Sequence, residues 1–263
     1  MFRKLLSLLF ILSLVLVSCT EPNTTESGSS ESQKSTAVIS DVLSYPLSPT
    51  DDMGQKYIDS FIFLGESTTY HLKSRGVLSG GTDTLQVWGP KSGTLMLDAS
   101  TASCRIVYPE SGEEIDVSEA MRRKKPRYIL LTFGLNGATK SFSKGSEYFK
   151  GCYKKLIDTL QSASPESIVI LQSCFPVAKS MDMSNYSVSA STLNSYIDTL
   201  NKWSAQLAEE LSVGYLNTAE ILKDANGFLF EEYQVGDGYH LSKDAYLKIL
   251  EYIRTHAYPK EKN

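Results

Sequence analysis

Three residues of the chain have the types and spacing that nucleophilic acyl transfer requires. Ser67 follows the apolar run 61–64 and a glycine, where a strand would turn sharply into a helix. Asp237 precedes His240 by three positions in a glycine-rich stretch, so its carboxylate is able to fold back onto the imidazole. A serine hydroxyl is a weak nucleophile at neutral pH and needs an adjacent base. These residues are therefore candidates for catalysis through a serine ester.

The other two histidines fit the role of base less well. His71 lies four positions after Ser67, on the same face of an expected helix, where we expect a packed or solvent-facing ring. His256 lies near the end of the last expected helix, a position typical of a surface histidine near a helix C-terminus. Only His240 has a carboxylate at a fitting distance on a loop.

A candidate hydrogen-bond donor for a developing oxyanion follows another apolar run. Asn136 stands in the stretch GLNG, directly after the run 128–133. The backbone N–H of Ser67, at the start of a helix, would point towards the same developing charge. Donors placed in this way stabilise the transition state of acyl transfer.

Together, three motifs resemble those of the SGNH, or GDSL-like, hydrolases. In chain order they are GESTT, GLNG and DGYHLS, which is the order of the family. The resemblance covers roughly residues 58–258. It implies Ser67 as the nucleophile, His240 as the general base and then acid, and Asp237 as the group that orients His240. The family's oxyanion hole uses the serine N–H, a glycine N–H and the asparagine side chain, which implies roles for Ser67 and Asn136.

The glycine of that oxyanion hole is less well defined by the motifs. We favour Gly93, because the stretch SGT around it resembles the family's SG-T element, and Gly89 and Gly81 are the alternatives. Two positions depart from the family pattern. Glu66 stands where aspartate is commoner, and Gly137 stands where an aspartate often follows the asparagine. Neither position performs the chemistry in the family, so both bear on substrate preference more than on activity.

The elements that position these residues are predicted by the pattern of apolar residues. Continuous apolar runs, typical of strands buried on both faces of a parallel sheet, occupy residues 61–64, 128–133, 168–171 and 213–216. Amphipathic helical patterns lie at residues 149–160, 193–207 and 246–253. This alternation predicts an α/β three-layer sandwich, doubly wound and flavodoxin-like, with a mostly parallel five-stranded sheet. In such a sheet the ligand site lies beyond the carboxyl ends of the strands.

The region 85–109 interrupts this alternation. Residues 86–88, 94–97 and 105–108 have the composition of short strands separated by turns. We expect one of them to join the main sheet and the others to form a small β-hairpin excursion. Further along the chain, we expect residues 172–176 and 179–191 to overhang Ser67.

The N-terminus has the pattern of an export signal. Two basic residues precede an apolar stretch, residues 5–17, that is too short for an ordinary membrane span. The stretch ends in LVSC and resembles a bacterial lipobox, which implies lipidation of Cys19; a plain signal peptide is the alternative. We predict a signal peptide over 1–18, a flexible tether over 19–57 and the hydrolase domain over 58–263. The protein would then be extracytoplasmic, and its lipid would be its only membrane anchor.

Composition excludes some partners. The net charge of −4 and the absence of a large basic cluster argue against nucleic acid. No cysteine or histidine pair has the spacing of a metal site, so we expect neither a metal nor another cofactor. The sequence makes no prediction of the oligomeric state.

The leading hypothesis is an esterase that removes small O-acyl groups, most plausibly acetyl, from extracellular or cell-wall carbohydrate. The carbohydrate part of this hypothesis follows from export, tethering and the habits of the family, and no residue carries it. A lipase or thioesterase, which would need an apolar acyl channel, is the enzymatic alternative. From other classes, the alternatives are a pseudo-enzyme that binds glycan or lipid and a tethered adhesion domain.

Overall fold

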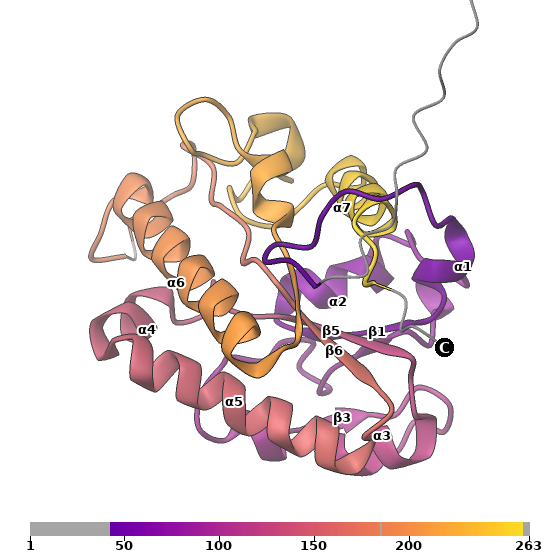
Figure 1. Cartoon of the computed structure of the whole chain (residues 1–263). Helices are drawn as coiled ribbons and strands as arrows, with labels where there is room; N and C mark the ends of the chain where they lie inside the picture. Colours follow the sequence, from indigo (N-terminus) through magenta and orange to yellow (C-terminus); the bar gives the residue numbers. More distant parts are fainter. Residues whose placement is uncertain (1–42, 185, 260–263) are drawn as a thin grey trace, which may run out of the picture. The chain divides into compact units, whose positions relative to one another are not determined.

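The computed structural model describes residues 43–184 and 186–259, and five parallel strands form its main sheet (Figure 1). The strands are β1 (Phe61–Gly65), β2 (Val87–Trp88), β5 (Tyr128–Thr132), β6 (Ile168–Gln172) and β7 (Gly214–Leu216). Their order across the sheet is β2-β1-β5-β6-β7, and every pair is parallel. This is the flavodoxin-like order, in which the second strand of the sheet lies outside the first. The predicted doubly wound α/β fold is therefore confirmed.

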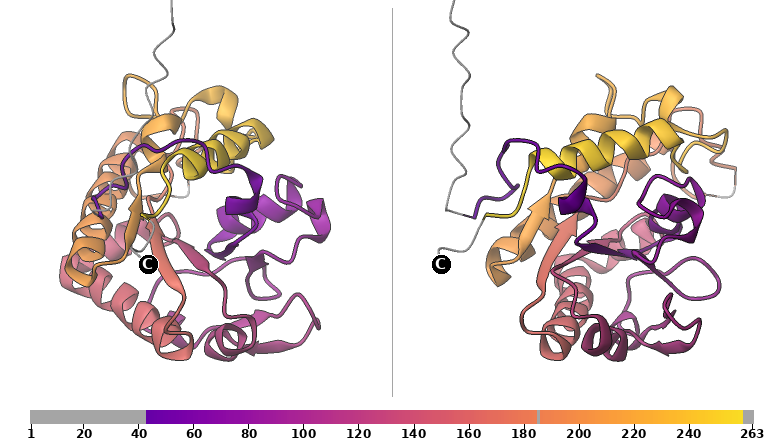
Figure 2. Two further views of the ribbon diagram at one scale, coloured as in Figure 1. Left: turned by 45° about the vertical axis from the view of Figure 1, so that its right-hand side comes forward. Right: turned by 90° about the vertical axis from the view of Figure 1, so that its right-hand side faces the viewer.

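Helices cover both faces of this sheet. They are α1 (Gln55–Ile58), α2 (Ser67–Ser74), α3 (Val117–Lys124), α4 (Ala138–Lys144), α5 (Ser146–Ala163), α6 (Ala190–Leu211) and α7 (Lys243–Thr255). Alternate residues of a strand point to opposite faces, so Ile129 and Leu131 pack in the core with α3 to α6, while Leu130 packs with α1, α2 and α7. Figure 2 shows the yellow α7 on one side of the strands and the salmon α5 on the other.

Burial on both faces explains the continuous apolar runs of the sequence. All five residues of β1 are buried, and Leu130 and Leu131 of β5 are fully buried. Each large apolar side chain buried in this way stabilises the fold by roughly 1.5–3 kcal/mol. The runs predicted as strands are consequently the elements that hold the sheet together.

The region 85–109 differs from the prediction. Residues Val87 and Trp88 form β2 at the sheet edge, as one of the expected strands, but residues 94–97 form a loop. The antiparallel pair is instead β3 (Arg105–Val107) with β4 (Glu114–Asp116). Two of the three residues of β4 are acidic, so this strand has almost no apolar signal in the sequence. The predicted hairpin excursion exists, but one of its two strands was assigned wrongly.

The folded domain begins earlier than predicted. Leu47 is buried, and its N–H donates to the carbonyl of Tyr215 in β7 at 2.8 Å. Residues 43–57, predicted as the end of the tether, therefore pack on the domain. The predicted signal peptide, Cys19 and residues 19–42 lie outside the described residues. None of the helices within the described ranges is long and apolar enough to cross a membrane.

Candidate active site

The turn from β1 into α2 places Ser67 at the carboxyl edge of the sheet. Ser67 is the first residue of α2. A side chain at Gly65 would overlap the carbonyl oxygen of Thr132 in β5, so glycine is required where the two strands approach. The buried Tyr246 of α7 donates its hydroxyl to the carbonyl of Thr68 at 2.6 Å. The first turn of α2 is thus held from both the sheet and α7.

The loop before α7 folds Asp237 back onto its own histidine. Asp237 Oδ1 accepts the N–H groups of Tyr239 at 3.1 Å and His240 at 2.9 Å. Gly238 has a φ of +84° and lies so close to Met181 that a side chain there would overlap the backbone of Met181. The three-residue spacing between Asp237 and His240 is therefore what one tight loop needs to turn the carboxylate towards the ring.

The structure brings the three predicted catalytic residues into one hydrogen-bonded chain. Ser67 Oγ lies 3.1 Å from His240 Nε2, and His240 Nδ1 lies 2.6 Å from Asp237 Oδ2. An ionised carboxylate only accepts hydrogen bonds, so Nδ1 carries the proton and Nε2 is free to accept the proton of the serine hydroxyl. This is the geometry in which an oriented imidazole activates a serine.

The surroundings of Asp237 favour its ionised form. Partial burial would raise the pKa of Asp237, but the N–H groups of His240 and Tyr239, together with the His240 ring, outweigh it and lower that pKa. The negative charge that orients His240 is therefore stable at neutral pH.

His71 packs directly against His240. The two ring centroids are 4.4 Å apart, so the packed position considered for His71 is the one observed. Burial, then the neighbouring His240 and Arg75, lower the pKa of His71 to about 4. Its Nδ1 is buried and has no hydrogen-bond partner among the residues that the structure describes. At neutral pH, His71 thus adds a neutral ring beside His240.

Glu66 holds the loop that carries Asn136. Its side chain is buried, and its two oxygens accept the N–H groups of Gly134 at 2.9 Å, Leu135 at 3.1 Å and Asn136 at 3.1 Å. Burial raises the pKa of Glu66 to about 7. The three N–H donors favour the carboxylate and lower this pKa, but their effect is smaller than that of burial. The sequence relates Glu66 to substrate preference. In the structure, the Glu66 side chain instead connects the start of α2, where Ser67 lies, to the loop that carries Asn136.

The predicted donors of the oxyanion hole converge on one point. The N–H of Ser67 donates to Thr94 Oγ1 at 3.1 Å, and Asn136 Nδ2 donates to the same oxygen at 2.9 Å. The predicted third donor is not directed there, because the N–H of Gly93 donates to the carbonyl of Pro90 at 2.9 Å in a local turn. The N–H of Gly93 therefore does not join the other two donors in this structure, and its role in an oxyanion hole stays a prediction. Of the alternatives, Gly81 also uses its N–H in a local turn.

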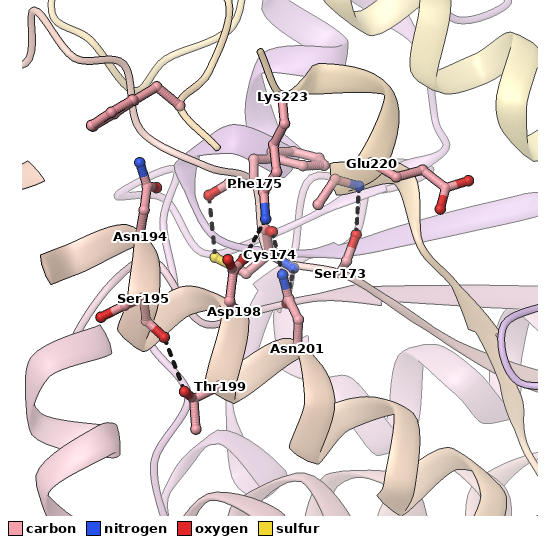
Figure 3. A network of polar contacts seen from close by, with 12 residues as sticks. Ser173, Cys174, Phe175, Asn194, Ser195, Asp198, Thr199, Asn201, Glu220 and Lys223 are labelled. Carbon is pink, nitrogen blue, oxygen red and sulfur yellow. Dashed lines mark hydrogen bonds and ion pairs between the residues drawn. The ribbon is translucent and has the colours of Figure 1, made fainter. Parts of the chain in front are cut away.

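The segment after β6 is not the rim that we predicted. Gln172 to Phe175 are buried, because α6 supplies hydrogen-bond partners that the sheet does not. Asn201 Oδ1 accepts the N–H of Cys174 at 2.7 Å, and its Nδ2 donates to the carbonyl of Cys174 at 2.9 Å (Figure 3). Asn194 makes the same pair of bonds to Val177.

The following segment does reach the loop that carries His240. The N–H of Ala178 donates to the carbonyl of Gly238 at 2.7 Å, and Met181 packs against Gly238. Beyond Met181 the side chains of residues 182–184 and 186–189 are mostly polar and exposed. This part of the predicted rim therefore borders the loop that carries His240.

Sequence reasoning missed the roles of Glu66 and Thr94, and it did not identify His240 as the ring against which His71 packs. Glu66 had a signal, since a charged residue directly after a buried strand and before a helix start tends to bind backbone N–H groups. Thr94 had none, because its contacts join segments that are far apart in the sequence.

Comparisons with known proteins place the chain in a family. The model of the GDSL-like lipase/acylhydrolase family matches residues 63–248. The chain belongs to this family, and its class is that of the ester hydrolases. No curated protein sequence matches the chain.

Several solved structures are similar to the chain at low identity. A DUF4886 family protein from Bacteroides uniformis is 13% identical with a TM-score of 0.46, over 73% of this chain and 82% of that chain. A mutant acetyl esterase with an acetate ion is 12% identical with a TM-score of 0.45, over 74% and 93% of the two chains. A catalytic mutant of an acetylxylan esterase from Geobacillus stearothermophilus is 15% identical with a TM-score of 0.40, over 75% and 94%.

Proposed function

We propose that the protein is a serine esterase in which Ser67, His240 and Asp237 form the catalytic triad. The observation that carries this proposal is the continuous chain from Ser67 Oγ through the His240 ring to Asp237 Oδ2, with distances of 3.1 and 2.6 Å. Its place at the carboxyl edge of a doubly wound sheet is where such folds bind ligands. Membership of the GDSL-like family supports the same reaction class.

The proposed reaction proceeds in two acyl transfers. Ser67 Oγ forms a bond to the ester carbonyl carbon, while His240 Nε2 takes the hydroxyl proton. The tetrahedral intermediate then releases the alcohol, which receives that proton from His240, and leaves the acyl group on Ser67. A water molecule attacks the acyl-serine with the same help from His240. This second step releases the carboxylic acid and restores Ser67.

We further propose that the substrate carries a short acyl group, namely acetyl, on extracellular or cell-wall carbohydrate. The segment that borders the loop of His240, described over residues 179–184 and 186–189, is mostly polar and exposed. Sites for long apolar ligands are normally lined by apolar side chains, and this segment does not provide such a lining. The export pattern and Cys19 support a location outside the cytoplasm, on a lipid anchor.

Hydrolysis of p-nitrophenyl esters of increasing chain length tests this proposal. We expect kcat/KM to be highest for the acetyl ester and to fall by the butyryl or hexanoyl ester. An apolar acyl pocket would instead favour each added methylene by about 1 kcal/mol or more. Ser67→Ala, as the matched control, should remove nearly all activity towards every ester. A profile that rises to the octanoyl ester would favour a lipase, and full activity in Ser67→Ala would contradict the triad.

A further inference from the structure

Both donors expected to bind the substrate's carbonyl oxygen are occupied by this chain itself. Ser67 N–H and Asn136 Nδ2 each donate to Thr94 Oγ1, at 3.1 and 2.9 Å. The second amide proton of Asn136 goes to the carbonyl of Leu95 at 3.0 Å. An oxyanion hole works by directing its donors at the position where the oxyanion develops. The Thr94 hydroxyl oxygen therefore stands at the position that a substrate oxygen would have to take.

Outside its bonds to Ser67 and Asn136, the loop that carries Thr94 is held by the N–H of Val107, which donates to the carbonyl of Gly89 at 2.9 Å, and by an exposed ion pair of Lys91 with Glu114. It runs over residues 89–96, none of which is buried, between the buried Trp88 and Leu97. Gly93, with a φ of +75°, makes a turn bond only to Pro90 within the loop. Segments with few buried contacts open locally at low free energy, so this loop is suited to move while its anchors stay in place.

A cavity lies between this loop and α2. A cavity of about 200 Å³ separates Gly89 and Pro90 from Tyr70 and Lys73 of α2. The ring of Tyr70 is exposed and lies 3.5 Å from the place where a side chain at Gly93 would begin. On the side of α2 the loop thus borders an aromatic ring and a cavity, while Leu95 packs partly against the core.

We propose that Thr94 closes the oxyanion hole of the resting protein and that outward movement of residues 89–96 opens it for the substrate. On opening, Ser67 N–H and Asn136 Nδ2 exchange the Thr94 hydroxyl oxygen for the carbonyl oxygen of the ester. The inference rests on the proposed esterase function and adds to it a residue that controls access. A protein that binds substrate only in its open form shows an affinity reduced by the open fraction.

A substitution can remove the hydroxyl of Thr94 and keep the shape of its side chain, which allows a direct test. Thr94→Val keeps the branched side chain but removes the acceptor, so the closed form would leave two N–H donors unpaired. Because unpaired donors are unfavourable, Thr94→Val should shift the loop towards the open form and raise kcat/KM for p-nitrophenyl acetate by about 10-fold. Thr94→Ser retains the oxygen, so its kcat/KM should stay below that of Thr94→Val.

Phenylboronic acid gives a second readout, because its adduct with a serine places an oxygen in the oxyanion hole. Thr94→Val should bind it more tightly than the wild type, by about the same factor of 10. In the wild type, binding should increase hydrogen exchange of residues 89–96, which a purely structural role for Thr94 would not cause. This wild-type measurement decides the question even where a variant folds poorly.

Two results would overturn the inference. One is a Thr94→Val enzyme with lower kcat/KM and weaker boronate binding than the wild type, since Thr94 would then only position Asn136. The other is increased protection of residues 89–96 in the wild-type boronate adduct. If neither ester hydrolysis nor boronate binding occurs in the wild type or the variants, the proposed function is wrong and this inference falls with it.

Discussion

Glu66 and His71 flank Ser67 and have pKa values shifted in opposite directions. Burial raises the pKa of Glu66 from 4.5 to about 7, whereas burial and the nearby His240 and Arg75 lower the pKa of His71 from 6.5 to about 4. A group whose pKa differs between the folded and unfolded states makes stability depend on pH. Between pH 4.5 and 6.5 the folded protein holds more protons on Glu66, and fewer on His71, than the unfolded chain does.

These shifts predict how Glu66→Gln changes the pH dependence of stability. The contribution of Glu66 to the free energy of unfolding is fully present below pH 4.5 and is lost as pH rises through about 7. The stability advantage of the wild type over Glu66→Gln should therefore fall by up to about 3 kcal/mol across that range. Urea denaturation at several pH values measures it.

His71→Asn provides the control for this experiment. The contribution of His71 is present above pH 6.5 and is lost as pH falls through about 4, so its difference from the wild type should slope the opposite way. Parallel pH profiles for the wild type and Glu66→Gln would contradict the description of Glu66.

At the scale of elements, the loop between Asp237 and His240 depends on one close backbone contact. Gly238 combines a φ of +84° with a position against the backbone of Met181. Gly227 has nearly the same φ, +83°, but nothing lies within 4 Å of the place where its side chain would be. A substitution at Gly227 would therefore cause only conformational strain, whereas one at Gly238 would cause both strain and a clash with Met181.

Gly238→Ala should displace the loop, and Gly227→Ala should not. Both changes introduce left-handed strain of roughly 1–2 kcal/mol. Only Gly238→Ala also forces Met181 and the loop apart, and a misplacement of about 1 Å at a catalytic group lowers activity by about 100-fold. Ester hydrolysis and thermal unfolding of both variants measure the two effects. Equal activity in the two variants would show that the contact with Met181 does not position His240.

At the scale of the whole molecule, the sequence predicted what local patterns encode. The sheet was predictable because strands buried on both faces, such as 61–64 and 128–133, leave continuous apolar runs. The grouping of Ser67 and Asn136 was predictable because both follow parallel strands, which end at one edge of the sheet. His240 follows no strand directly, and its pairing with Ser67 was predicted from the resemblance to the SGNH hydrolases.

Contacts between distant segments were not predictable in the same way. Residues 172–176 have the polar and turn residues of a loop, yet they are buried because Asn194 and Asn201 of α6 bind the backbone of this stretch and its neighbour Val177. Thr94 has an ordinary loop composition around it, and its role follows only from bonds to Ser67 and Asn136. Such bonds form only once the elements have packed.

The anchoring of the molecule is a separate prediction from its N-terminus. Cys19→Ala should prevent lipid modification and move the protein from the membrane fraction to the soluble fraction of the cell that expresses it. Metabolic labelling with a fatty-acid analogue and fractionation measure both effects. A wild-type protein that carries no lipid and fractionates as soluble would show that the lipobox pattern at Cys19 is not used.

Reaction with a fluorophosphonate probe, followed by peptide mapping with mass spectrometry, tests most directly whether Ser67 is the nucleophile. A phosphonate reacts with a serine that is activated by an adjacent base. We predict that the wild-type protein gains one adduct on the peptide that contains Ser67, that Ser67→Ala gains none, and that His240→Ala reacts far more slowly. An unmodified Ser67 in folded wild-type protein, or an adduct that persists in Ser67→Ala, would contradict the account.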